Sequence, residues 1–273
     1  MNIHNAWLIF RKDWLEIKRN WQVLLPIIIL PIIFAIVFPA IIVLTSSAPM
    51  QNTSGQDFQA LIPNLPADAQ GLIAQMTPGQ VLIYIMVLYF FAPFFLIIPI
   101  MASSVIGSDS FAGERERKTI EALLATPISD SELILGKILV SFIPAMAITW
   151  GSFAIYAIVV DAITATMFNG MLLLPNAVWL IMIFGVTPTI ALCSIGLTVI
   201  ISSKVKGFKE AQQISVVLLL PVLGLVFAQI SGVLILGPAV LAALIAILAA
   251  VDIAVFYVGV KMFRREEILS KPA

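Results

Sequence analysis

Charged residues and the usual catalytic side chains are scarce in this sequence. Of its 273 residues, 11% are charged and 61% are hydrophobic, against about 25% and about 45–50% in typical soluble domains. It has one histidine, His4, and one cysteine, Cys193, which excludes an internal disulfide and a histidine-rich metal site. It contains no GxxxxGK[ST] loop for phosphates. We therefore expect no catalytic residue, no metal site and no cofactor in this chain.

The hydrophobic residues are gathered into six long runs. Each run is near the roughly 20 residues that a helix needs to cross the hydrocarbon core of a bilayer. We place the runs at 22–45, 80–106, 133–160, 177–201, 213–231 and 236–260. The sequence thus predicts an all-α integral membrane protein with six transmembrane helices, forming one transmembrane domain over residues 1–273.

Lysine and arginine are confined to alternate connections between these runs. All 15 lie before the first run, after the sixth, or in and at the edges of the connections between runs two and three and runs four and five. The connections 46–79, 161–176 and 231–237 carry none. Because cytoplasmic loops carry an excess of basic residues, we expect both termini and the segment 107–132 to be cytoplasmic, and 46–79 to be an extracytoplasmic loop.

Residues 1–21 predict an amphipathic helix that lies in the plane of the membrane. An apolar stripe recurs at spacings of three and four residues and consists of Ile3, Trp7, Phe10, Trp14, Ile17 and Trp21. Most of the charged residues lie off this stripe, a pattern typical of interfacial helices. A simple positively charged anchor before the first span is a second interpretation, compatible with the first.

The longest charged stretch follows the second run and reads ERERKTIEALLATPISDSELILGK, from Glu114 to Lys137. Ile120, Leu123 and Leu124 have helical spacing and form one apolar stripe. Glu114 and Lys118 are four residues apart in the order that supports a helix. The pattern predicts a short amphipathic helix that offers one apolar face to something outside the membrane; a solvated loop with no partner is the alternative.

This helix is expected to end before Pro127, because a residue that precedes proline is disfavoured in the α region. Ser129 and Glu132 then form a capping box, which marks the start of the next helix. The segment 107–132 is thus predicted to be a lever that joins the second and third spans.

One acidic residue, Asp252, lies well inside a predicted span. Ionisable groups in that position are costly and are therefore candidate functional residues. Asp252 could carry a proton or cation, or it could hydrogen-bond to a neighbouring helix in a structural role. The first interpretation defines an alternative function, a proton- or ion-coupled secondary transporter. Asp109 lies near the end of the second span, where we expect water to reach it.

The charged stretch resembles the signature of the type-2 ABC exporter permeases. That pattern, E-x-E-x-x-T-x-E-x-L-L-x-x-P…G-K after the second span, is matched from Glu114 to Pro127 and at Gly136-Lys137. The later run from Ser202 to Gln213 is similar to the family's fourth cytoplasmic-side connection. One departure is Lys118, where many members carry glycine.

The resemblance implies a permease subunit of an ATP-driven exporter. In such proteins the helix after the second span is a coupling helix that docks on a separate ATP-binding subunit, and the N-terminal helix is a connecting helix beside it. By position, the docking residues would be Thr119, Ile120, Glu121, Leu123 and Leu124. Glu114 and Glu116 would lie at the root of the lever. ATP and Mg would be bound by the partner subunit.

The resemblance also implies partners and a location. We expect a homodimer, or a heterodimer with a second permease subunit, together with two ATP-binding subunits and surrounding membrane lipids. No nucleic acid is expected. The stand-alone permease design suggests a plasma membrane location, and the family as a whole moves drugs, lipids, polysaccharides, peptides and ions.

Overall fold

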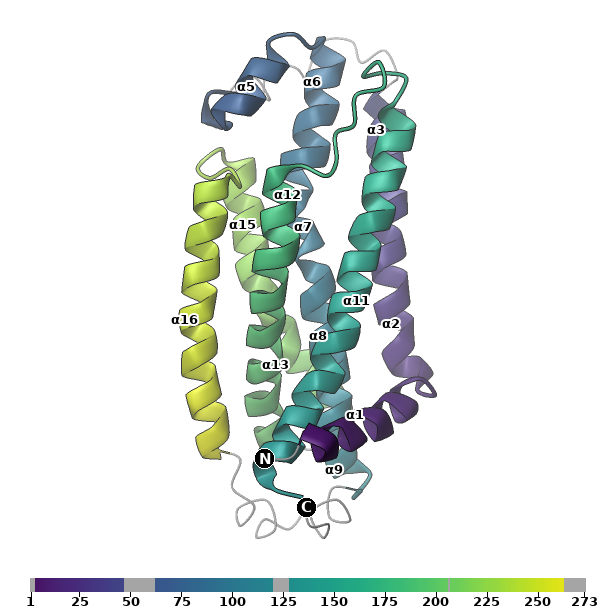
Figure 1. Ribbon diagram of the computed structural model, residues 1–273, viewed down its shortest axis with the longest axis vertical. Helices are drawn as coiled ribbons and strands as arrows, with labels where there is room; N and C mark the ends of the chain where they lie inside the picture. Colours follow the sequence, from purple (N-terminus) through teal and green to yellow (C-terminus); the bar gives the residue numbers. More distant parts are fainter. Residues whose placement is uncertain (1–2, 47–61, 120–127, 206, 263–273) are drawn as a thin grey trace.

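The computed structural model describes residues 3–46, 62–119, 128–205 and 207–262, which form an elongated bundle of helices (Figure 1). Six helical segments in these residues are long and apolar enough to cross a membrane. They are Trp21–Thr45, Pro78–Glu116, Ser131–Thr164, Ala177–Lys204, Phe208–Ile230 and Pro238–Tyr257. The described residues contain no β-strand. The predicted all-α fold with six candidate transmembrane helices is confirmed.

Most spans are chains of shorter helical elements. The first consists of α2 (Trp21–Ile32), η1 (Ile33–Val37) and α3 (Phe38–Ser46). The second consists of α6 (Pro78–Ile85), η3 (Met86–Phe90), α7 (Ala92–Phe95), α8 (Ile97–Ser108), η4 (Asp109–Gly113) and α9 (Glu114–Glu116). The third is α11 (Asp130–Thr164), and the fourth consists of α12 (Ala177–Ile181), η5 (Met182–Val186) and α13 (Thr187–Lys204). The fifth consists of α14 (Phe208–Ser215), η6 (Val216–Leu219) and α15 (Leu220–Ile230), and the sixth is α16 (Pro238–Met262).

Three further elements of the described residues lie outside the spans. They are α1 (Ile3–Ile17), η2 (Ile62–Asn64) and α5 (Ala67–Ile73). In Figure 1, α5 lies at the upper end of the bundle, and α1 crosses the lower end beside the start of α11.

The second span lies at the centre of the bundle because its neighbours bind its backbone directly. The π-helical turn η3 changes the backbone hydrogen-bonding pattern and leaves carbonyls for side chains to satisfy. Tyr156 donates from its hydroxyl to the Val87 carbonyl (2.8 Å), Trp179 from Nε1 to that of Leu88 (2.9 Å), and Gln229 from Nε2 to that of Tyr89 (2.8 Å). Spans three, four and five are thereby attached to three consecutive carbonyls of span two.

The apolar stripe expected over residues 1–21 does not lie on one helix, since α1 ends at Ile17 and Trp21 begins α2. Its residues are divided between the protein interior and the surface. Phe10 and Ile17 are buried against the bundle, whereas Trp7 and Trp21 are 51% and 67% exposed. The helix lies close to α11 because Gly136 has no side chain: a Cβ there would be 2.7 Å from Cβ of Ile9. The α1 helix is therefore part of the packed structure, with Trp7 at its surface.

The basic residues that the structure describes lie at one end of the bundle. We call this the basic end; it contains α1, α9, the first turns of α11, the last turn of α13 and the start of α14, at the bottom of Figure 1. In the described connections at the opposite end, residues 62–77, 165–176 and 231–237, no lysine or arginine occurs.

Candidate functional site

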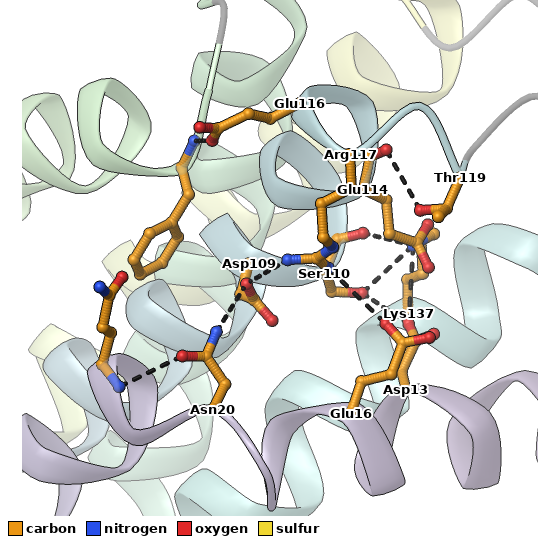
Figure 2. A network of polar contacts seen from close by, with 12 residues as sticks. Asp13, Glu16, Asn20, Asp109, Ser110, Glu114, Glu116, Arg117, Thr119 and Lys137 are labelled. Atoms are coloured by element: carbon orange, nitrogen blue, oxygen red, sulfur yellow. Dashed lines mark hydrogen bonds and ion pairs between the residues drawn. The ribbon is translucent and has the colours of Figure 1, made fainter.

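Four consecutive residues, Glu114 to Arg117, connect the end of the second span to four other parts of the bundle. Figure 2 labels three of them, Glu114, Glu116 and Arg117, with several of their partners. They comprise α9 and its C-terminal cap. Because each side chain has a different partner, these residues place α9 at the junction of α1, α11, α13 and α14. They are described one at a time below.

Glu114 is buried and pairs with two lysines, one buried and one partly exposed. It is 1% exposed, and its Oε2 lies 2.6 Å from Nζ of Lys137, which is fully buried in α11. Its Oε1 accepts a hydrogen bond from Lys12 of α1. A buried charge is tolerated only where it is paired and hydrogen-bonded, so Glu114 fixes the root of the segment 107–132 to α1 and α11.

Asp13 completes the charge balance around Lys137. Its Oδ2 lies 3.5 Å from Nζ of Lys137 and accepts a hydrogen bond from the Ser110 hydroxyl at 2.7 Å. Lys137 also donates to the Ser110 carbonyl and lies 3.3 Å from its hydroxyl. Two buried carboxylates thus face two ammonium groups, those of Lys137 and Lys12.

These ion pairs shift the pKa values of both α1 residues. Burial alone would raise the pKa of the Asp13 carboxyl, but the charges of Lys137 and Lys12 and the Ser110 hydrogen bond lower it below its ordinary value. Burial opposes the charge on Lys12, but Asp13 and Glu114 outweigh it and raise the pKa of Lys12. Both residues are therefore charged across the physiological pH range.

Arg115 and Glu116 bind the two ends of the connection between spans four and five. Arg115 donates from Nη1 to the carbonyls of Ser202 (2.9 Å) and Ser203 (3.3 Å), in the last turn of α13. Glu116 accepts at Oε2 from the backbone N–H of Phe208 (2.8 Å), the first residue of α14. A cation at a helix C-terminus and an anion at an N-terminus both complement the helix dipole.

Arg117 closes the arrangement around Asp109. Its Nη1 lies 3.0 Å from Oδ1 of Asp109, and its Nη2 lies 3.6 Å from Oε2 of Glu16. Oδ1 of Asp109 also accepts a hydrogen bond from Nδ2 of Asn20 at 3.2 Å. Asp109 is 3% exposed. The expectation that water reaches it is wrong, because Arg117 and Asn20 cover it.

The buried and partly buried charged and hydroxyl side chains described above form one group. The polar cluster, as we use the term below, comprises Lys12, Asp13, Asp109, Ser110, Glu114, Arg117 and Lys137.

The helix at the root of the segment is shorter than predicted. Lys118 has a left-handed backbone with φ of 57°. The N–H of Thr119 donates to the Glu114 carbonyl (3.0 Å) and that of Lys118 to the Arg115 carbonyl (3.1 Å), which is the Schellman pattern of a helix end. The expected helical pairing of Glu114 with Lys118 is therefore wrong. Lys118 occupies the position where glycine is favoured and where the resembling permeases often carry it.

The predicted docking residues lie mostly outside the described residues. Thr119 is described, and its hydroxyl donates to the Glu114 carbonyl at 3.2 Å. Ile120, Glu121, Leu123 and Leu124 are not among the described residues, so the docking surface stays a prediction. The two predicted root residues, Glu114 and Glu116, are brought together in α9 with separate partners.

The start of the third span is as predicted. Glu132 accepts from the N–H of Ser129 at 3.2 Å, and Ser129 Oγ accepts from the N–H of Glu132, so the capping box is confirmed. Oε2 of Glu132 also accepts from Nδ2 of Asn5 (3.0 Å), which adds a second connection between α11 and α1.

Asp252 lies elsewhere, on α16. Its carboxyl is beside the thiol of Cys193 on α13, and its Oδ1 is buried without a hydrogen-bond partner among the described residues. The structure thus places it between two packed helices, separate from the polar cluster.

Sequence reasoning did not single out Lys137 or Asp13 as site residues. A signal for Lys137 was present, because a lysine inside a predicted span is costly and needs a partner. Asp13 had no comparable signal, since it lies outside the predicted spans and its burial depends on the packing of α1.

A family model describes the region that contains these residues. The model of ABC-2 family transporter proteins matches residues 7–258, which include the whole polar cluster, Arg115, Glu116 and Asp252. No curated protein matches the sequence.

Proposed function

This chain belongs to the ABC-2 transporter family, and we propose that it is the permease subunit of an ATP-driven exporter. It would work in the plasma membrane as a homodimer or heterodimer with two ATP-binding subunits, which bind ATP and Mg. A multi-pass membrane protein of this family needs no catalytic residue of its own. The energy comes from the preference of ATP for the closed form of its partner.

The observation that carries this proposal is the anchoring of residues 114–117. The root of the segment 107–132 is bound to α1 and α11 through Glu114, to α13 through Arg115 and to α14 through Glu116. A force applied to that segment would reach four helices at once. This is the mechanical property that a coupling element requires, and a solvated loop without a partner has no need of it.

The charge distribution supports the orientation. Because basic residues favour the cytoplasmic side, we assign the basic end, both termini and the segment 107–132 to the cytoplasm. Closure of the ATP-binding subunits would then push on the segment from the side where ATP is available, tilt spans two and three, and open a pathway outward.

Co-purification tests the proposal. We would isolate the tagged chain from its native membrane in mild detergent, identify the proteins that accompany it and measure ATP hydrolysis. We expect an ATP-binding subunit with the native chain and its loss with the double variant Glu121→Arg, Leu124→Asp. The control is Leu172→Asp, at a residue 72% exposed beyond the opposite end of α11, which should retain the subunit.

Asp252 supports a second candidate, a proton- or ion-coupled secondary transporter. Its unpaired buried Oδ1 is the specific observation in favour. Under that function Asp252→Asn abolishes transport, whereas in an ATP-driven permease transport is mostly retained. The absence of any ATP-binding subunit from the native preparation would make the second candidate the better one.

A further inference from the structure

We propose that Glu116 is a positioning residue that passes motion from the root of the segment 107–132 directly to the fifth span. It does so by binding the first turn of α14, the helix with which that span begins. This inference rests on the proposed function and specifies which of the contacts of residues 114–117 carries the motion to the fifth span.

The contact between Glu116 and α14 is close and specific. Oε2 of Glu116 accepts from the Phe208 N–H at 2.8 Å. Gly207 leaves room for the carboxylate: a Cβ there would lie 2.6 Å from Oε2 and 2.9 Å from Cδ of Glu116. Gly207 has φ of −161°, an extended conformation open to any residue. Space for Glu116, and not backbone freedom, is therefore what requires glycine.

Small apolar side chains bring the two elements together behind this contact. Ala112 of η4 and Ala211 of α14 are both fully buried in one cluster with Val205. Because alanine is small, the backbones of η4 and α14 lie close together, and the Glu116 carboxylate can reach the start of α14. The contacts of α9 with Lys137 and with α13 fix the position of α9 itself.

The fifth span is loosely packed, so a force on its first turn can move it. The segment Phe208–Ile230 is a single candidate span; 22% of its apolar 18-residue window is buried, against 67% of the corresponding window of span two. Its far end is attached to span two by the Gln229 bond to the Tyr89 carbonyl. Between these two attachments lies a pocket of about 180 Å³, with Ser104 and Val105 on α8 and Gln212 and Ser215 on α14. Incomplete packing there leaves space for α14 to shift relative to α8.

The test measures whether α14 responds to nucleotide in the intact complex. We would place a reporter by Gln212→Cys in a Cys193→Ser background, which removes the chain's single native cysteine. Labelling of the reporter by a maleimide is compared with and without a non-hydrolysable ATP analogue. Three second-site variants are compared with the reporter chain: Glu116→Ala, Glu116→Gln and Gly207→Ala. Co-purification of the ATP-binding subunit is measured for each.

We expect the analogue to change the labelling rate in the reporter chain. This change is lost in Glu116→Ala, which has no acceptor, and in Gly207→Ala, whose methyl group displaces the carboxylate. It is retained in Glu116→Gln, which still accepts from the Phe208 N–H. The ATP-binding subunit stays bound in all three, so a general loss of structure would be recognised.

Two results would overturn the inference while leaving the proposed function in place, and a third would overturn both. If Glu116→Ala and Gly207→Ala both keep the nucleotide response, Glu116 does not transmit motion to α14. If Glu116→Gln loses the response while the subunit stays bound, the hydrogen bond to Phe208 is not the link. If no ATP-binding subunit accompanies the native chain, the proposed function itself is rejected, and the inference with it.

Discussion

Lys137 is the residue on which the polar cluster depends. It is fully buried in α11 and faces the carboxylates of Glu114 and Asp13. Removing one partner of a buried ion pair typically costs about 3–5 kcal/mol, because the remaining charge is left uncompensated. We expect Lys137→Met to destabilise the protein by about 3 kcal/mol, the lower value because Lys12 still pairs with both acids.

A thermal unfolding series in detergent would check this prediction. Adding Glu114→Gln to Lys137→Met should restore part of the loss, since it removes one uncompensated charge. Lys209→Met, at an exposed position on α14, is the control and should have little effect. A loss of the same size in the control would contradict the interpretation.

The left-handed backbone of Lys118 destabilises the folded protein. An L-residue with a side chain in this region is less stable than glycine by roughly 1 kcal/mol. Lys118→Gly should therefore stabilise the protein by about that amount, whereas Lys118→Ala should give no gain because it keeps the Cβ. Equal stability of the glycine and alanine variants, measured by thermal unfolding, would argue against the helix end at this residue.

The lowered pKa of Asp13 predicts that its contribution to the free energy of unfolding is lost at acidic pH. A carboxyl whose pKa is lower in the folded state stabilises the fold above its unfolded pKa, about 3.9, and this contribution is lost as the pH falls through the folded pKa. Asp13→Asn should therefore be less stable than the native protein at neutral pH, and the difference should shrink progressively below about pH 4. A difference that does not change with pH would show that the charge of Asp13 is not the stabilising feature.

At the scale of elements, the sequence predicted the transmembrane helices better than their ends. Hydrophobic runs and basic connections were enough to identify six spans, and the capping box located the start of α11 at Ser129. The second span was expected to stop near residue 106 but is helical to Glu116. Its polar last turns are stabilised by partners on α1, α11, α13 and α14, and hydropathy along one segment contains no information about such partners.

Some residues of the candidate site could be named from the sequence, but their partners could not. The resemblance predicts a role for Glu114 and Glu116 at the root of the segment; the structure places both in α9, at the end of the second span, and their role stays a prediction. Their partners, Lys137 and the N–H of Phe208, come from elements 23 and 92 residues away in sequence. A single sequence contains no signal that pairs residues over such separations.

The packing of α1 on α11 gives a prediction about two elements. A methyl group at Gly136 would lie 2.8 Å from the Ala6 carbonyl and 2.7 Å from Cβ of Ile9, so α1 would have to move away. Gly136→Ala should destabilise the protein even though alanine is the better helix former by about 1 kcal/mol.

Gly151, on the same helix, is a matched control for this substitution. Nothing lies within 4 Å of a Cβ at that position, so Gly151→Ala should be neutral or stabilising. Thermal unfolding of both variants checks the prediction. If Gly136→Ala were as stable as Gly151→Ala, the close approach of α1 would not be needed for the fold.

At the scale of the whole molecule, the two ends of the bundle differ in chemistry. The basic end contains the polar cluster, and the described connections at the opposite end contain no lysine or arginine. Paired acids and bases inside the basic end fix the elements there, while exposed basic residues at that end, such as Arg11 and Lys209, favour the cytoplasmic side. The same end is thus suited both to orient the chain and to receive a partner.

This asymmetry predicts the topology. In a Cys193→Ser background, Val233→Cys places a thiol in the connection between α15 and α16, where Val233 is 83% exposed. Lys209→Cys places one on α14 at the basic end. With intact cells, a membrane-impermeant maleimide should label the cysteine of Val233→Cys at once and that of Lys209→Cys only after permeabilisation. The reverse pattern would place the basic end outside the cell, where no ATP-binding subunit could act on it, and would exclude the proposed mechanism.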